Sequence, residues 1–390
     1  MKPGLPPPSA AAWKALGPYA RGRLQLRALG QTLTLDVPHD VFSSQRIDDG
    51  TLLLLEHLPA AQPRRVLDLG CGYGALGLPI AARLPKAHFL LIDRDLLAVA
   101  ASAHNAAALR LANVEAHPGL GYRGLEGERF DLVLCNVPAR IGPRAIRYLL
   151  EGGRALGAEV RVVVIRDLAP VVEGLGLEGL THVARGPRHD IFALASGSAT
   201  LDLDALDDDE VYARDQTHFE GLTFTRPHDA SEDPKHLPFL SVLAQALPRK
   251  APKNALVFRA SYGPLPLALK ARYPSCEVTA QERDLLDAAF LRRNSAALGL
   301  ALQVRETLFP ALPGEAGKYA LVCGELSAPA GKGVAVRELK EAHSLLAEGG
   351  EALILVTEKQ EWEWLQGTPN ATILLRREGA CVLRISRARG

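Results

Sequence analysis

One glycine-rich segment restricts the fold of this chain more than any other part of it. Residues 66–77 read Val-Leu-Asp-Leu-Gly-Cys-Gly-Tyr-Gly-Ala-Leu-Gly, an apolar strand followed by glycines where a helix is expected to begin. A second apolar run starts at Phe89 and ends on Asp93. Glycines at the carboxyl end of a central strand let the backbone approach a ligand closely, and an acid after the next strand can accept hydrogen bonds from two ribose hydroxyls. The pattern predicts a nucleotide-type cofactor site on a parallel α/β sheet.

Two classes of cofactor use a turn of this kind, and a tight turn without any ligand is the third possibility. Residues 72–77 satisfy G-x-G-x-x-G, the dinucleotide pattern, which is weak evidence when it stands alone. Dinucleotide sites usually have an apolar residue two places before the first glycine, whereas this chain has Asp68 there. The run therefore resembles the first motif of class I S-adenosylmethionine-dependent methyltransferases. The resemblance implies that Asp68 reaches the region of the methionine ammonium group and that Asp93 holds the ribose.

Length and composition narrow the class of protein. A chain of 390 residues suits two domains of about 150 to 200 residues each. The net charge of +1 excludes a global attraction to nucleic acid, so any RNA contact must be a local patch. No apolar run approaches the length of a membrane span, and the proline-rich start lacks a signal-peptide core. The five cysteines have no metal-ligand spacing and are expected to be buried and reduced, which favours a cytoplasmic protein without a metal.

An internal repeat runs through the chain. Pro38-His39-Asp40 recurs as Pro227-His228-Asp229, an offset of 189 that is the difference between 227 and 38. The same offset aligns Arg94-Asp95-Leu96-Leu97 with residues 283–286 and Asn105 with Asn294. A constant offset over more than a hundred residues predicts a tandem duplication. We expect a lead segment at 1–30, a cofactor-binding domain at 31–196, an acidic linker at 197–215 and a second domain at 216–390.

Each copy alternates apolar strands with amphipathic helices, which predicts a mostly parallel, doubly wound, Rossmann-like sheet with an antiparallel edge. In the first copy we expect strands at 65–69, 89–93, 114–117, 130–136 and 160–165, edge strands at 180–184 and 191–195, and helices at 75–84, 96–109 and 144–156.

The second copy has lost the chemistry of the glycine turn. Val257 stands for Asp68, Arg259 for Gly70 and Ser261 for Gly72. Arg259 would place a long side chain where the cofactor must pass, although Glu282 keeps an acid opposite Asp93. We expect a degenerate copy that keeps the fold and not the site, with a structural or RNA-docking role.

The fourth strand of the first copy delivers Asn136-Val137-Pro138-Ala139 beside the glycine turn. Together with the segment from His39 to Leu54, these residues resemble the ribosomal RNA (guanine-N2) methyltransferases of the small subunit and their large-subunit relatives. That family has Asn-Pro-Pro-Phe at this place, and its degenerate copy commonly comes first rather than second.

The resemblance implies a chemical role for this tetrapeptide. An exocyclic amine is a poor nucleophile, and the Asn136 side-chain oxygen with the following backbone carbonyl can accept its two protons. The sequence keeps Pro138, and the loss of the first proline to Val137 is tolerable because the carbonyl remains. The family's aromatic stacks on the flipped base, and its replacement by Ala139 removes a platform worth about 1–3 kcal/mol per base. Phe42 and Tyr122 are the candidates to replace it; otherwise the acceptor is not a base in the usual pose, or the enzyme is weak or dead.

The sequence thus assigns three sets of residues. Catalysis falls to Asn136, Val137 and Pro138; S-adenosylmethionine binding to Asp68, Gly70, Cys71, Gly72, Gly74, Asp93, Arg94, His117, Asn136 and Thr51; and RNA contacts to Phe42, Arg140, Arg144 and Arg147. A strand-end cap for Asn136, a packing role for His117 and a solvated helix face for the arginines remain the alternatives.

The predicted function is S-adenosylmethionine-dependent methyl transfer to a guanine amine of ribosomal RNA or of a ribosomal subunit. A protein or small-molecule amide or amine is the alternative acceptor. A non-catalytic RNA-binding or ribosome-assembly factor that retains the cofactor pocket is the alternative from another class.

Overall fold

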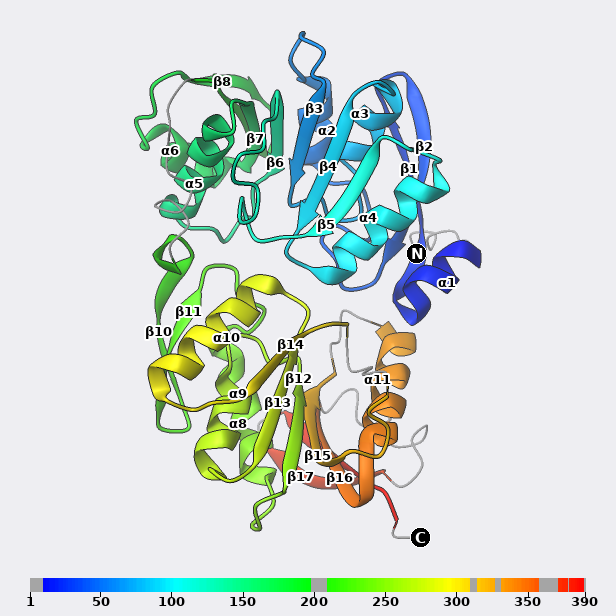
Figure 1. Cartoon of the computed structure of the whole chain (residues 1–390), viewed down its shortest axis with the longest axis vertical. Coiled ribbons are helices and arrows are strands. Elements are labelled where there is room, and N and C mark those ends of the chain that lie inside the picture. The colour runs from blue at the N-terminus through cyan, green and yellow to red at the C-terminus, as the bar shows by residue number, and fades with distance from the viewer. Residues whose placement is uncertain are drawn as a thin grey trace. The chain divides into compact units, whose positions relative to one another are not determined.

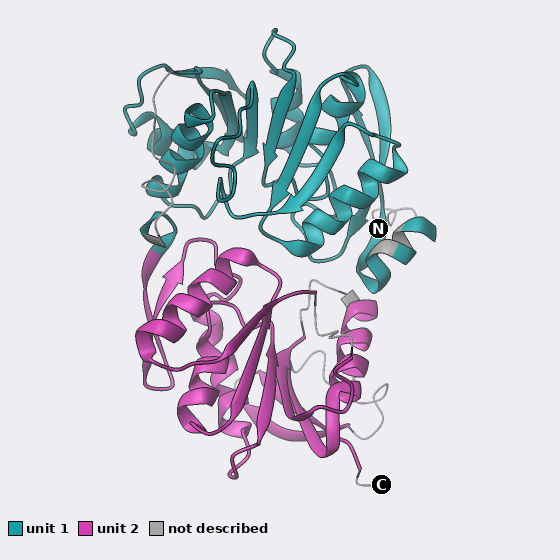
Figure 2. Cartoon of the chain, in the orientation of Figure 1, with its two compact units in different colours: residues 1–213 teal, residues 214–390 magenta. Residues whose placement is uncertain are grey.

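The computed structural model describes residues 10–197, 209–308, 314–326, 331–357, 371–377 and 379–388. The chain divides into two compact units, Met1–Ala213 and Arg214–Gly390 (Figure 2). The division falls inside segment 197–215, for which the sequence predicts an acidic linker, and residues 198–208 of that segment lie outside the described ranges. No helix in the described part of the chain is long and apolar enough to cross a membrane.

The first unit is built on a seven-stranded sheet with the order β5-β4-β3-β6-β7-β9-β8 (Figure 1). Its strands run parallel from β5 to β7, and β9 is antiparallel to both β7 and β8. A separate antiparallel hairpin precedes the sheet. The strands are β1 (Ala20–Ala28), β2 (Gln31–Pro38), β3 (Arg65–Leu69), β4 (His88–Asp93), β5 (Val114–Pro118), β6 (Leu132–Asn136), β7 (Glu159–Ile165), β8 (Leu180–Arg185) and β9 (His189–Leu194).

Helices cover this sheet and connect its strands. Helix α4 packs on β2, β4 and β5, α5 on β6 and β7, and α2 on β7 and β9. Aspartates cap the amino ends of α2 and α4. The side chains of Asp48 and Asp95 accept hydrogen bonds from backbone N–H groups in the first turns of these helices. The helical elements are α1 (Ala10–Leu16), η1 (Gly17–Tyr19), α2 (Asp49–Glu56), α3 (Gly77–Arg83), α4 (Leu96–Ala108), α5 (Pro143–Ala155), η2 (Arg166–Leu168), α6 (Ala169–Glu173) and η3 (Asp209–Val211).

The second unit repeats this topology. Its sheet has the order β14-β13-β12-β15-β16-β18-β17, which is the order of the first sheet with the corresponding strands. Its elements are β10 (Ala213–Phe219), β11 (Leu222–Pro227), η4 (Pro234–His236), α8 (Leu237–Ala246), β12 (Asn254–Phe258), α9 (Pro264–Arg272), β13 (Glu277–Glu282), α10 (Leu285–Leu298), β14 (Gln303–Glu306), β15 (Tyr319–Glu325), α11 (Gly331–Leu345), β16 (Leu346–Thr357), β17 (Ala371–Arg377) and β18 (Ala380–Ser386).

The duplication extends to individual hydrogen bonds. The Asn105 side chain on α4 donates to the carbonyls of Asp36 and Tyr73 and accepts from the Asp36 N–H, each at 2.9 Å. Asn294 on α10 makes the same three bonds, at the same distance, to Thr225 and Tyr262, the residues 189 positions later. In both units one buried amide therefore ties the hairpin, the strand-to-helix turn and the following helix together.

The predicted doubly wound fold with an antiparallel edge is confirmed, with small shifts at element ends. Strand β6 begins at Leu132 rather than at residue 130, and the side chain of Asp131 just before it accepts the backbone N–H groups of Arg64 and Arg65. Helix α3 begins at Gly77 rather than at residue 75, where the Asp68 carboxylate accepts the Gly77 N–H. All five cysteines are buried and free, as predicted.

Candidate cofactor and acceptor site

The glycine turn after β3 has two kinds of glycine. Gly70, Gly72 and Gly74 all have positive φ, at 80°, 58° and 89°. A Cβ on Gly70 or Gly72 would meet no heavy atom within 4 Å, whereas one on Gly74 would lie 2.4 Å from Leu78. Gly74 therefore serves close packing of the turn on α3, while Gly70 and Gly72 border open space where a ligand can approach the backbone.

Asp68 lies beneath this turn with one carboxylate oxygen unused. Its Oδ2 accepts the Gly77 N–H at 2.8 Å, and its Oδ1 is buried without a hydrogen-bond partner among the described residues. Burial raises the pKa of Asp68 to about 7, the Gly77 hydrogen bond opposes that rise, and the nearby Asp93 charge adds to it. A buried acceptor without a donor is costly, so this oxygen is suited to a cationic or hydrogen-bond-donating group of a ligand.

Asp93 at the end of β4 organises the turn from the other side. Its Oδ2 accepts the Gly72 N–H at 2.8 Å and its Oδ1 accepts the Asp95 N–H at 2.9 Å. A carboxylate can accept hydrogen bonds from two vicinal hydroxyls, which is the role that the sequence predicts for Asp93. Arg94 follows it and is half-buried.

Asn136 at the end of β6 is held by two residues, the N-cap of α2 and a residue of its first turn. Its Nδ2 donates to Asp48 Oδ2 at 2.9 Å and to Thr51 Oγ1 at 3.1 Å. The Asp48 carboxylate can only accept, so it fixes which end of the amide is the nitrogen. The amide oxygen is then the Asn136 atom that can accept a proton from an amine. Thr51, predicted to bind the cofactor, is buried and positions Asn136.

The three residues after Asn136 provide no aromatic side chain on which a base could stack. Val137 is buried and its N–H bonds the Val163 carbonyl at 2.9 Å, while Pro138 and Ala139 are exposed. Tyr122 is wrong as a replacement aromatic, since it is 1% exposed and its hydroxyl bonds the Leu149 carbonyl beneath α5. Phe42 is 70% exposed, on the loop that leads to Asp48.

The three predicted RNA-contacting arginines differ in their surroundings. Arg140 is exposed. Arg144 lies 3.7 Å from Glu210, and both side chains remain largely exposed. Arg147 bonds Glu151 and the Leu175 carbonyl, so its guanidinium is directed along the protein surface toward α6. The expected common face is therefore reduced to Arg140 and Arg144.

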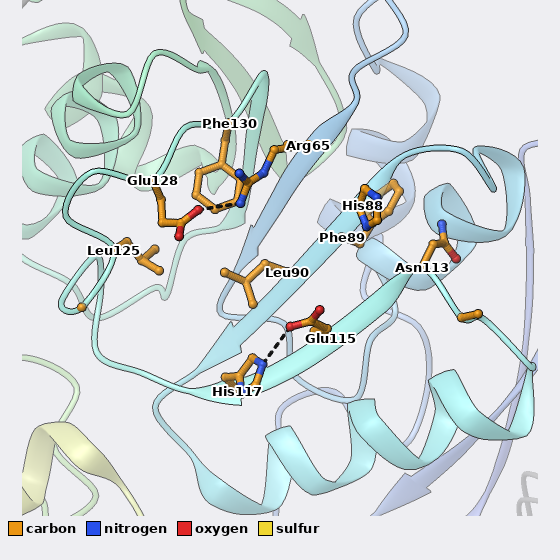
Figure 3. A pocket seen from close by; sticks show the side chains of 12 residues that line it. Arg65, His88, Phe89, Leu90, Asn113, Glu115, His117, Leu125, Glu128 and Phe130 are labelled. Atoms are coloured by element: carbon orange, nitrogen blue, oxygen red, sulfur yellow. Dashed lines mark hydrogen bonds and ion pairs between the residues drawn. The ribbon is translucent and has the colours of Figure 1, made fainter.

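His117 lies in a separate pocket of about 460 Å³ on β4 and β5. Its Nε2 is 3.3 Å from Glu115, and the two side chains point toward one another (Figure 3). The described lining of this pocket includes neither Asp93 nor a glycine of the turn. A contact of His117 with an adenine ring stays a prediction.

Cys71 and Cys135 are shielded rather than reactive. Burial raises the pKa of both thiols, and the nearby acids Asp93 and Asp68 raise them further. Ser102 on α4 donates to the Gly72 carbonyl at 2.9 Å and lies 3.4 Å from the Cys71 sulfur. The backbone of Cys71 contributes to the turn, since its N–H bonds the Ile92 carbonyl at 3.0 Å.

In the second unit the side chains at the equivalent turn form hydrogen bonds with one another. Ser231 donates from its N–H to Asp287 Oδ2 at 3.0 Å, and its hydroxyl bonds both Asp287 and the Ser261 hydroxyl. Arg259 adopts φ 53° and pairs with the buried Glu338 at 2.6 Å. The polar side chains around the degenerate turn are therefore bonded to one another.

Sequence reasoning missed two residues that hold the site. Asp48 is visible in the sequence only as a helix N-cap before an apolar run, and Ser102 is an inconspicuous polar residue in an alanine-rich helix. Nothing local in the sequence links Asp48 to Asn136, which lies 88 positions away.

The residues of the first unit fit S-adenosylmethionine. The orphaned Asp68 Oδ1 suits an ammonium group, the open faces of Gly70 and Gly72 admit close contact, and Asp93 suits a ribose. Such a cofactor would supply an electrophilic methyl group, and these residues would hold it.

Comparisons with known proteins bear on the first unit. Residues 32–156 match the family model described as the methyltransferase small domain, which agrees with the fold and the glycine turn. The resemblance noted in the sequence is thereby confirmed for the first unit.

Individual relatives are ribosomal RNA methyltransferases. The ribosomal RNA small subunit methyltransferase C of Pseudomonas entomophila is 40% identical over 143 residues, 34% of this chain and 42% of that protein. The ribosomal RNA large subunit methyltransferase G of Streptomyces coelicolor is 36% identical over 157 residues, 38% of this chain and 42% of that protein. The chain thus spans between about a quarter and about two fifths of the length of the curated relatives it matches.

A solved structure extends the likeness to both units. The T. Thermophilus 16S rRNA N2 methyltransferase, in complex with AdoMet and guanosine, covers 94% of this chain and 98% of its own, with a TM-score of 0.67. Its sequence is 19% identical, so the match establishes the two-unit fold.

Proposed function

We propose that this protein is an S-adenosylmethionine-dependent methyltransferase that modifies the exocyclic amine of a guanine in ribosomal RNA. The observation that carries the proposal is the orientation of Asn136, whose nitrogen is held by Asp48 and Thr51 so that its oxygen can accept an amine proton. The relatives named above act on ribosomal RNA, which supports this acceptor class. A ribosomal RNA substrate also implies work in the cytoplasm.

The residues of the site divide the reaction between them. Asp68, Gly70, Gly72 and Asp93 bind and orient the cofactor. The Asn136 oxygen and the Val137 carbonyl accept hydrogen bonds from the two amine N–H groups, localise the nitrogen lone pair and aim it at the methyl group. As the N–C bond forms and the sulfonium S–C bond breaks, the nitrogen becomes cationic and loses one proton to water. Transfer from a sulfonium requires in-line geometry more than a strong base, so the main contribution is positioning. The second unit serves as a scaffold or RNA-docking half, because at its own turn Arg259 pairs with Glu338 and Ser261 with Ser231.

Methyl incorporation tests this proposal. The protein is incubated with methyl-labelled S-adenosylmethionine and, separately, unmodified ribosomal subunits, naked ribosomal RNA and a protein extract. Label in RNA that is released as N2-methylguanosine, and is lost with Asn136→Ala, is expected. Label only in protein would assign an amide acceptor instead. No label, together with no cofactor binding in calorimetry, would leave a binding factor.

A further inference from the structure

The second unit has an unusual group of side chains at the place that corresponds to Asn136. Glu325 ends β15 at the position 189 residues after Asn136, and His236 of η4 contacts it through Nε2, 2.8 Å from each carboxylate oxygen. Glu232 is the third member. One ligand atom from each of the three residues lies within 4.8 Å of the other two.

Glu232 distinguishes this group from a simple ion pair. Its Oε1 is buried and has no hydrogen-bond partner among the described residues, although the residue as a whole is half-buried. His236 pairs with one carboxylate, so the group has an excess of acceptor oxygens over donors.

The partners of the first-unit site are absent from this place. Leu237 and Leu240 stand at the positions of Asp48 and Thr51, so nothing equivalent could hold an amide here. In their stead the loop before α8 brings Glu232 and His236 to the end of β15. The polar chemistry of this edge has changed from amide positioning to a histidine with two carboxylates.

We propose that Glu232, His236 and Glu325 bind a divalent transition-metal cation, with Zn²⁺ as the probe that fits their donor set. One imidazole nitrogen and two carboxylate oxygens are ligands that Zn²⁺ accepts at about 2.0–2.2 Å, with a fourth position left for water or another donor. Ligand atoms of one zinc ion lie roughly 3.5 Å apart. Side-chain rotations that move these ligand atoms by about an ångström would bring them to that separation. The ion would join the loop at 232–236 to the sheet and satisfy the buried Glu232 oxygen.

Zinc binding by the full chain tests the site. Metal-free protein is dialysed against Zn²⁺, and bound metal is measured by mass spectrometry for the wild type, Glu232→Gln, His236→Gln and Glu325→Gln. His218→Gln is the matched control, because His218 is an exposed histidine on β10 of the same unit. We expect each of the first three variants to lose one equivalent of bound zinc and the His218→Gln control to lose none. The zinc affinity of each of the three variants should fall at least about tenfold. Mutation of a residue that only hydrogen-bonds to a metal ligand already lowers metal affinity by about 10- to 100-fold.

Two results would overturn the site. Equal zinc content in the wild type and all variants would assign any bound metal elsewhere, and no bound zinc in the wild type would leave a His236–Glu325 ion pair alone. If the variants fail to fold, cobalt(II) added to the wild type gives a second test of the site. Visible absorption bands that Zn²⁺ displaces are expected from a low-coordinate site, and their absence counts against it. The site lies outside the first unit, so its result does not depend on the proposed methyl transfer.

Discussion

Asn136 Nδ2 lies 2.9 Å from Asp48 Oδ2, and the same Asp48 oxygen accepts the Thr51 N–H at 3.1 Å. One carboxylate therefore begins helix α2 and orients the amide that would receive the acceptor amine. Helix capping and acceptor positioning are joined in a single residue.

Asp48→Ala should separate these two roles. Loss of the cap is expected to cost about 1 kcal/mol of stability, and a misoriented Asn136 is expected to lower kcat about 10- to 100-fold with little change in cofactor affinity. Asp284→Ala is the matched control, because Asp284 caps α10 in the second unit and loses the same kind of cap. Thermal melts and single-turnover methylation measure the two effects. Equal loss of activity in both variants would mean that Asp48 acts through stability alone.

Asp68 predicts a pH dependence of cofactor binding. Its pKa is raised to about 7, so the carboxyl is mostly protonated at pH 6 and half ionised at pH 7. An ammonium group binds the ionised form, and affinity should rise roughly fivefold over that interval, below the range in which an α-amino group titrates. Calorimetry at both pH values checks this, and Asp68→Asn should remove the dependence. 5′-Methylthioadenosine, which lacks the ammonium, is the matched ligand; a similar dependence for it would assign the titration to another group.

Gly70→Arg would install the residue found in the degenerate copy. Arg259 shows that the equivalent turn of the second unit accepts an arginine at φ 53°, so the first unit should still fold with a strain of about 1–3 kcal/mol. The long side chain should occupy the open face of the turn and weaken S-adenosylmethionine binding at least about 100-fold. Gly70→Ala has the same backbone penalty, but its Cβ would meet no heavy atom within 4 Å. It therefore separates the effect of backbone strain on binding from the effect of a blocking side chain. Similar affinity losses in both variants would contradict blockage by the side chain.

Phe42 is expected to supply the base platform that Ala139 lacks. Its 70% exposure is high for a phenylalanine, and it lies on the loop joined to Asn136 through Asp48. Phe42→Ala should weaken RNA binding by about 1–3 kcal/mol, roughly 5- to 150-fold, and leave cofactor affinity unchanged. Ile373→Ala, at an exposed apolar residue of the second unit, is the control. Rescue of Phe42→Ala by Ala139→Phe would place a base between them, whereas full activity of Phe42→Ala would exclude stacking on this ring.

Local sequence pattern predicts the parts of the site that are contiguous in the chain, and it fails where distant segments meet. Strand β3 and the turn after it were predictable because apolar residues, Asp68 and the glycines are contiguous. The constant offset identified the second copy in the same way. Three findings could not be read from the sequence. Tyr122 faces inward beneath α5, Asp48 reaches Asn136, and Ser231 bonds Asp287 at the degenerate site. Each depends on how a loop folds back over a sheet, which periodicity does not encode.

The repeated asparagine offers a matched pair of substitutions. Asn105→Ala and Asn294→Ala each remove three hydrogen bonds at 2.9 Å and leave buried backbone groups unpaired, so each should destabilise its own unit by about 2–4 kcal/mol. Only Asn105 holds the carbonyl of Tyr73 in the cofactor turn, so only its loss should also weaken S-adenosylmethionine binding, measured by calorimetry well below the melting temperature. Hydrogen exchange resolved by segment reports which unit loosens. If Asn294→Ala weakened cofactor binding as much as Asn105→Ala, the two copies would be coupled, and the division into one binding unit and one scaffold would fail.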